Sequence, residues 1–239
     1  MGTRLLARGL DLRQSDTSHW NLAFPEIVRS IHEADLAAGA GWITCNTFGA
    51  NRFWLDRYQS KTQVRLINQK AVEIAREAIG NSGKKAIIAG SIGPTAFADE
   101  LTLREQAEAL VAAGADCLLF ETLSQAEAEK LVEWKLADEF SQSWVSLYDW
   151  GKDPAETAQR LQASGFRQFG MNCLADKKQI ELTLDKFIKI EGIEILVKPS
   201  AMPAQQLLEI ARKYAGMGLV AIGGCCGTDE RFIRELAEY

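Results

Sequence analysis

A regular alternation of short apolar runs with longer amphipathic stretches is the feature that most constrains the fold of this chain. Apolar runs bounded by turn residues are typical of buried strands, whereas apolar residues recurring every three to four positions are typical of helices. One strand and the helix after it take about 30 residues, and this unit recurs seven times without a linker. Such alternation predicts an α/β fold with a parallel sheet, organised as a single domain over residues 1–239.

Each predicted element follows from this pattern. The predicted strands are 41–48, 85–94 with its exit loop, 116–122, 144–148, 168–173, 193–199 and 219–222. The predicted helices are 3–14, 25–38, 51–79 in two pieces, 103–113, 124–138, 154–163, 177–189, 203–214 and 229–238. Residues 15–21 are predicted to form a loop, and the hydroxyls of Ser124 and Thr228 to cap the helices that follow them.

Seven strand–helix units after a lone helical region favour a (β/α)8 TIM barrel that lacks its first β-strand at the N-terminus. An open, doubly wound sheet is the alternative, because it is built from the same alternation of elements. A barrel without its first strand leaves two strand edges unpaired, at 42–46 and at 219–222.

Composition excludes several classes of function. The net charge is −5, and no basic stripe or stacking-aromatic pattern is present, so nucleic acid is not an expected partner. No apolar run reaches the roughly 18 residues of a membrane span, and the apolar stretch at the N-terminus is too short for a signal peptide. The 5 cysteines, an odd number, favour a reducing compartment over a disulfide framework, which predicts a cytoplasmic protein.

Polar residues mark the carboxyl ends of the predicted strands, which converge on one mouth in a barrel. In chain order these residues are Asn46, Ser91, Glu121, Ser146 or Tyr148, Cys173, Lys198, and Cys225 with Cys226. Two of them have purely structural alternatives, because Glu121 could cap the next helix and Asn46 could tie two loops together.

The cysteines divide into two groups. Cys45 and Cys117 lie inside apolar strands and are assigned to the core. Cys173 ends a strand, and Cys225 and Cys226 are adjacent on a glycine-rich turn, where a disulfide between neighbours would strain the peptide. Three thiolates with one open position are the ligand set of a catalytic zinc site. A backbone phosphate grip at Gly223-Gly224 and a core role for the thiols are the alternatives.

Several motifs together resemble the homocysteine S-methyltransferase family over essentially the whole chain. They are Gly170-Met-Asn-Cys173, Ile222-Gly-Gly-Cys-Cys-Gly-Thr228, Ala38-Gly-Ala-Gly-Trp-Ile-Thr-Cys-Asn-Thr-Phe48, Gly90-Ser-Ile-Gly-Pro94 and Phe120-Glu-Thr122. The resemblance implies a barrel, one zinc ion held by Cys173, Cys225 and Cys226, and L-homocysteine as methyl acceptor. It also implies that Glu121 holds the amino group of the substrate. Asn46 and Ser91 are predicted as further polar contacts at the mouth.

Two segments depart from the family pattern. The family begins with a strand that ends in Asp-Gly-(Gly/Ala)-Met-Gly-Thr, whereas this chain begins at Met1-Gly2-Thr3. We therefore expect a truncated form with reduced stability and weak turnover, in which an upstream segment would raise both. The family often shows Pro-Asn-Ala-Gly where this chain has Pro199-Ser-Ala-Met-Pro203, which changes the local substrate contacts.

The implied reaction is chemically consistent with a zinc site. A free thiol with a pKa of about 8.5 is mostly protonated at neutral pH, and metal binding removes its proton so that a nucleophile forms. Attack on an activated methyl group gives L-methionine. Betaine, S-methylmethionine, S-adenosylmethionine and methylcobalamin are all open as donors. The alternatives are an inactive or partner-dependent barrel-fold binding protein and a phosphate-binding barrel enzyme.

Overall fold

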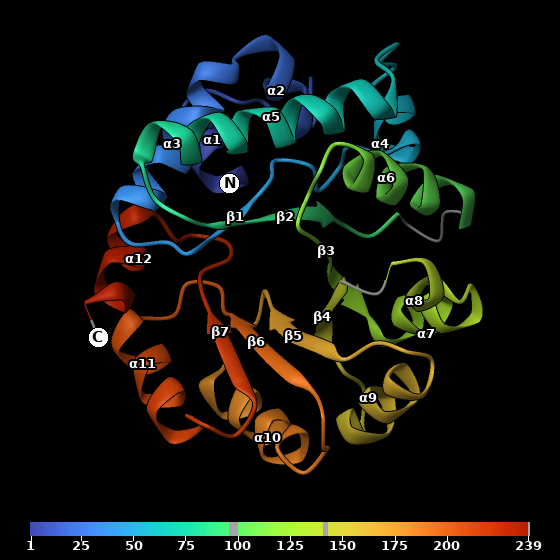
Figure 1. The fold of residues 1–239 in the computed structure, drawn as a ribbon, viewed down its shortest axis with the longest axis vertical. Coiled ribbons are helices and arrows are strands. Elements are labelled where there is room, and N and C mark those ends of the chain that lie inside the picture. Colours follow the sequence, from blue (N-terminus) through green and yellow to red (C-terminus); the bar gives the residue numbers. More distant parts are fainter. Residues whose placement is uncertain (96–99, 141–142, 239) are drawn as a thin grey trace. The chain divides into compact units, whose positions relative to one another are not determined.

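The computed structural model describes residues 1–95, 100–140 and 143–238, and its α/β fold confirms the predicted class (Figure 1). The strand order in the sheet follows the chain from β1 to β7. The chain divides into two compact units, Met1–Leu119 and Phe120–Tyr239. In described residues 1–41 there is no strand, so the chain enters its sheet from helices, as the pattern predicts.

The first unit carries most of its helices before and between two parallel strands. Its elements are α1 (Gly2–Leu6), the short 3-10 helix η1 (Thr17–His19), α2 (Trp20–Ala23), α3 (Pro25–Ala37), β1 (Trp42–Thr44), α4 (Arg52–Arg57), α5 (Val64–Ser82), β2 (Ile87–Ile92) and α6 (Glu100–Ala112). Strand β3 (Cys117–Ser124) begins in this unit and ends in the next. β1 pairs with β2 in parallel, with Ile43 opposite Ile88.

The second unit repeats the strand–helix pattern without interruption. Its elements are α7 (Gln125–Glu133), α8 (Leu136–Glu139), β4 (Ser143–Asp149), α9 (Pro154–Ala163), β5 (Gln168–Asn172), α10 (Lys177–Phe187), β6 (Glu194–Lys198), α11 (Ala204–Lys213), β7 (Leu219–Ile222) and α12 (Glu230–Ala237). Strands β4, β5, β6 and β7 pair in parallel in that order, and α9, α10 and α11 lie in a row along them (Figure 1). All carboxyl ends of these strands therefore meet at one edge.

The N-terminal region differs from the sequence prediction. Helix α1 ends at Leu6 instead of continuing to residue 14, because Gly9 has a φ of +99°, which a helix does not accommodate. Residues 15–21 are partly helical instead of a loop. The Asp16 carboxylate accepts the Ser18 N–H at 2.8 Å and starts the turn, and the buried Trp20 anchors it.

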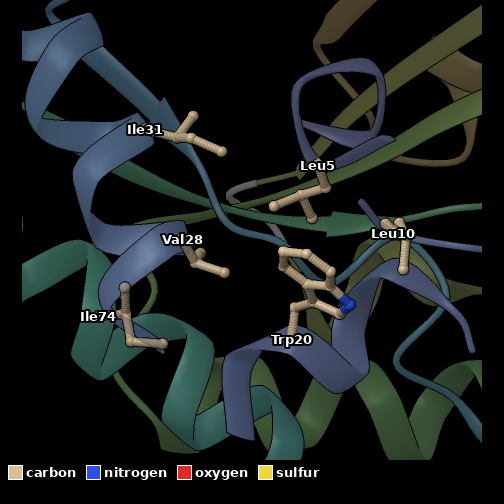
Figure 2. Packing of buried hydrophobic residues seen from close by; sticks show 6 residues of the cluster. All are labelled: Leu5, Leu10, Trp20, Val28, Ile31 and Ile74. Atoms are coloured by element: carbon tan, nitrogen blue, oxygen red, sulfur yellow. The ribbon is translucent and has the colours of Figure 1, made fainter. Parts of the chain in front are cut away.

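This N-terminal region is held by a cluster of apolar side chains (Figure 2). Helices α1, α2, α3 and α5 and the segment between α1 and α2 contribute to it. Its buried members are Leu5, Leu10, Trp20, Val28, Ile31 and Ile74. Burying a side chain of this size stabilises the fold by about 1.5–3 kcal/mol, which explains why a short, weakly helical segment is ordered here.

One predicted helix cap is confirmed and another is wrong. Ser124 starts α7 through a capping box, in which its hydroxyl accepts the Glu127 N–H and the Glu127 carboxylate accepts the Ser124 N–H. Helix α12 is capped by Asp229, whose carboxylate accepts the N–H groups of Arg231 and Phe232, and not by Thr228. The Thr228 hydroxyl instead donates to the carbonyl oxygen of Cys225 at 2.8 Å.

In the part of the chain that the structure describes, no helix combines the length and apolar character needed to cross a bilayer.

Candidate metal centre

The ends of β5 and β7 carry the three thiols, and the end of β6 holds both loops in place. The N–H of Cys173 donates to the carbonyl oxygen of Lys198 at 3.3 Å, and the N–H of Cys225 donates to that of Pro199 at 3.0 Å. The N–H of Ala201 donates to the carbonyl oxygen of Cys226 at 3.1 Å. The backbone of the β6 exit therefore sets the spacing between the two cysteine loops.

These bonds bring the three predicted ligands together. The sulfur atoms of Cys173, Cys225 and Cys226 all lie within 4.8 Å of one another, and those of Cys173 and Cys225 are 2.9 Å apart. Cys173 and Cys225 are half-buried and Cys226 is exposed. Three thiols on separate backbone positions, one of them open to solvent, are the donors that zinc prefers at a catalytic site. The donor chemistry of the cluster therefore fits zinc.

Two residues near the thiol cluster, Cys173 and Thr122, have an unusual backbone conformation. Cys173 has a φ of +60° and Thr122 a φ of +62°. Residues other than glycine rarely adopt this left-handed backbone conformation. Strain of this kind is concentrated at functional sites. Both residues are bonded to Asn172: its Oδ1 accepts the Thr122 N–H at 3.0 Å, and its Nδ2 donates to the Cys173 sulfur at 3.5 Å.

Hydrogen bonding makes the three thiols unequal. Cys173 and Cys225 share a hydrogen bond between their sulfur atoms, which lowers the pKa of Cys225 below the ordinary thiol value and raises that of Cys173. Burial raises the pKa of Cys226, and the nearby charge of Cys225 raises it further. Ionised thiols this close repel one another, so the cluster gains from a cation that lets all three ionise.

A buried ion pair belongs to the same unit. The Nζ of Lys198, at the end of β6, lies 2.9 Å from Oε2 of Glu121 on β3, and the side chains are 13% and 9% exposed. Burial opposes the charge on Lys198, but the negative charge of Glu121 and its hydrogen bond outweigh it, so the pKa of Lys198 is raised. Glu121 does not cap α7, since Ser124 and Glu127 form that capping box.

The other predicted polar contacts lie in the first unit. Asn46 ties the exit of β1 to the helical segment η1–α2, since its Nδ2 donates to the carbonyl oxygen of Thr17 at 2.7 Å and to Oδ1 of Asn21 at 3.0 Å. Ser91 is buried, and its carbonyl oxygen accepts the Thr47 hydroxyl at 2.7 Å. The structural alternative for Asn46 is thus confirmed, and contact of Asn46 or Ser91 with substrate stays a prediction.

The two cysteines assigned to the core are buried to different extents. Cys45 is 2% exposed, whereas Cys117 is only half-buried. Burial raises the pKa of both thiols to about 12, so neither is a ready metal ligand or nucleophile at neutral pH.

Three residues of the site carry no predicted function. Lys198 and Ser146 are predicted only as polar residues at strand ends, and Asn172 only as part of a motif. Ser146 donates its hydroxyl to Oδ1 of Asn172 at 2.7 Å. Their signal was a polar residue inside an apolar strand, which requires a partner when it is buried.

The chain is similar in sequence to proteins of known function. A methionine synthase from Mycobacterium tuberculosis is 27% identical over 284 residues, covering 99% of this chain and 24% of the relative. One from Mycobacterium leprae is 26% identical, covering 89% of this chain and 21% of the relative. The chain thus spans about a quarter of the length of the curated relatives it matches.

Solved structures share its fold. The oxidized form of the homocysteine methyltransferase MmuM from Escherichia coli is 26% identical with a TM-score of 0.85, covering 100% of this chain and 93% of that one. The metallated form of the same protein also has a TM-score of 0.85, at 24% identity and the same coverage. The model of the family described as homocysteine S-methyltransferase matches residues 1–239. The chain therefore belongs to the homocysteine S-methyltransferase family.

Proposed function

We propose that this chain is a zinc-dependent homocysteine S-methyltransferase that forms L-methionine. The observation that carries the proposal is the cluster of three thiols within 4.8 Å at the ends of β5 and β7. Membership of the family supports homocysteine as the acceptor. The cluster supports zinc, because soft thiolate ligands select it over oxygen-preferring cations.

Each residue of the centre has a distinct task. Cys173, Cys225 and Cys226 hold the zinc ion, which supplies deprotonation of the substrate thiol at neutral pH. Glu121 accepts hydrogen bonds from the substrate ammonium and orients the acceptor. The thiolate of homocysteine attacks the methyl carbon of the donor, and the donor leaves with the electron pair of the bond that breaks.

The methyl donor is the open half of the reaction. Betaine and S-methylmethionine are small and freely diffusing, S-adenosylmethionine is larger, and methylcobalamin is carried by a protein or domain. Methionine formation from homocysteine with each of these four donors, assayed in parallel on zinc-loaded protein, identifies the donor. Failure of all four to give methionine contradicts the proposed reaction.

Binding is measured independently of turnover. Calorimetric titration with homocysteine is expected to show binding to zinc-loaded protein and none after chelation. Glu121→Ala is expected to weaken binding by about 1.5–3 kcal/mol, the range for a hydrogen bond to a charged group. Equal affinity in the variant removes Glu121 from the proposed site.

We also propose a cytoplasmic location. All five cysteines are free thiols in the structure, and free thiols persist where the surroundings are reducing. Fractionation of cells with an antibody to the chain tests this proposal.

A further inference from the structure

Lys198 and Glu121 form an ion pair that is far more buried than its neighbours. Their side chains are 13% and 9% exposed, whereas those of Lys177 and Glu209 in the same unit are 32% and 47% exposed. A buried ion pair rarely gains more from attraction than it loses by leaving water. A pair of this kind beside a reactive cluster is therefore a candidate for function.

The scaffold of the thiol cluster carries both charges. Lys198 pairs in register with Asn172, and its carbonyl oxygen accepts the N–H of Cys173. Glu121 directly precedes Thr122, whose N–H donates to Asn172. The ammonium and the carboxylate thus project from the two strands that also fix the Cys173 loop.

We propose that Lys198 binds the α-carboxylate of the acceptor amino acid while Glu121 binds its α-ammonium. This inference rests on the proposed function, since it assigns the recognition of the same acceptor. An α-amino acid presents opposite charges on one carbon, and the Lys198–Glu121 pair presents the opposite charges in return. Entry of the zwitterion gives an alternating arrangement of four charges in which each group faces an opposite one.

The pair also explains how the site stays organised without substrate. In the free protein each charge satisfies the other at 2.9 Å, so neither is left buried and alone. Preorganised groups of this kind lose little conformational freedom when the ligand arrives. The site then prefers an amino acid over other thiols because both charges of the ligand are bound. A ligand that lacks one of them leaves Lys198 or Glu121 buried without its ligand partner.

Three small thiol ligands distinguish recognition of the carboxylate from recognition of the ammonium. Homocysteine carries both, 3-aminopropanethiol lacks the carboxylate, and 4-mercaptobutyrate lacks the ammonium. The affinities are measured by calorimetric titration of zinc-loaded protein. Lys198→Met is expected to lower the affinity for homocysteine and for 4-mercaptobutyrate by at least about tenfold, as the loss of a hydrogen bond to a charged group does. Its affinity for 3-aminopropanethiol is expected to stay the same or to increase, because Glu121 is released. The surface variant Lys177→Met is the matched control and is expected to bind all three as the parent does.

Equal weakening of all three thiols in Lys198→Met overturns the inference, because Lys198 then acts on the thiol cluster and not on the carboxylate. If that variant does not fold, the neutral pair Lys198→Met with Glu121→Gln replaces it. The double variant is expected to lose the preference for homocysteine over both analogues, and retention of that preference overturns the inference. Binding of none of the three thiols by the zinc-loaded parent contradicts the proposed function itself. Equal binding of all three contradicts the recognition of charge by Lys198 and Glu121, and leaves the zinc-bound thiol of the proposed function standing.

Discussion

The side-chain amide of Asn172 joins the backbone of Thr122 to the sulfur of Cys173. Its oxygen accepts the Thr122 N–H at 3.0 Å, and its nitrogen lies 3.5 Å from the sulfur atom. The same nitrogen donates to the Thr122 hydroxyl at 2.7 Å, and the Ser146 hydroxyl completes the set. A fully buried amide with all these partners fixes the position of Cys173 from outside the cluster of three thiols.

Replacement of Asn172 by Asp tests that role. The substitution keeps the oxygen that binds Thr122 and Ser146 but puts a carboxylate oxygen where an N–H faces sulfur. We expect zinc affinity to fall by about 10–100-fold, the range for outer-shell partners of a metal ligand. Competition with a chelating dye measures the affinity, and the sulfur-to-metal charge-transfer band of cobalt-loaded protein is expected to shift.

Asn68 supplies a matched control for that variant. It is also fully buried, and its amide donates to the carbonyl oxygens of Ala50 and Val64. Asn68→Asp is expected to lower stability while leaving zinc affinity and the cobalt spectrum unchanged. A change of similar size in both variants means that Asn172 acts only through general stability.

Removal of one thiol tests the ligand set. Cys226 is exposed, so Cys226→Ala leaves no cavity in the core and is expected to fold as the parent does. We expect it to bind far less than one zinc per chain when metal is measured by elemental analysis after purification without chelator. The buried Cys45 gives the control Cys45→Ala, which is expected to retain zinc. Undiminished zinc in Cys226→Ala contradicts the assignment.

A methyl group at Gly224 is expected to displace the turn that carries two thiols. The added Cβ would lie 2.7 Å from Cβ and 2.8 Å from Cγ2 of Thr228, and closer still to its hydroxyl oxygen. Gly224→Ala should therefore cost about 1–3 kcal/mol of stability, as other overpacked positions do, and weaken zinc binding. At Gly223 the nearest atom, Cγ of Lys198, is 3.6 Å away, so Gly223→Ala is the neutral control.

Thermal unfolding and zinc titration of the two glycine variants separate these expectations. Adding Thr228→Gly to Gly224→Ala removes the clash and is expected to restore part of the zinc affinity. No recovery in the double variant would show that the Thr228 contact is not the cause.

Acid is expected to destabilise the protein through His32. Burial, with the positive charges of the amino terminus and of Arg4 adding to it, lowers the pKa of His32 to about 3. Its Nε2 has no hydrogen-bond partner among the described residues. The unfolded chain takes up a proton below about pH 6.5 and the folded one does not, so stability falls as the pH drops from 6.5 towards 3.

The slope of this loss reaches about 1.4 kcal/mol per pH unit for one proton. Urea unfolding at a series of pH values is expected to show it in the parent and to show a shallower slope in His32→Asn. The other histidine of the chain supplies the control His19→Asn. A parallel pH dependence in the parent and His32→Asn would exclude His32 as the cause.

Sequence reasoning succeeded where one local signal dominated. Strand β7 and helix α9 lie at the predicted residues, because each is a short apolar run or a periodic stretch between strong punctuating residues. The thiols were also predictable, since the ends of parallel strands are brought to one edge by the fold class alone. The prediction of one helix over residues 3–14 failed because a single residue, Gly9, takes a left-handed backbone conformation that a helix does not accommodate.

The pairing of side chains across the sheet was beyond prediction. Lys198 and Glu121 are 77 positions apart and lie on strands β6 and β3, which are not neighbours in the strand order. No periodic pattern specifies such a contact, because it depends on how far each strand extends past its neighbours. The same holds for the Asn172 amide, whose partners come from β3 and β4 as well as from its own loop.

The exit of β6 holds the two cysteine loops through its backbone, by the carbonyl oxygens of Lys198 and Pro199 and the N–H groups of Ser200 and Ala201. Every amino acid offers the carbonyl oxygen and every one but proline offers the N–H, so these contacts do not require particular side chains. This chain has Pro199-Ser-Ala-Met-Pro203 at the exit and still brings its three sulfur atoms within 4.8 Å of one another. Side chains can therefore change at this exit while its backbone keeps the thiols together.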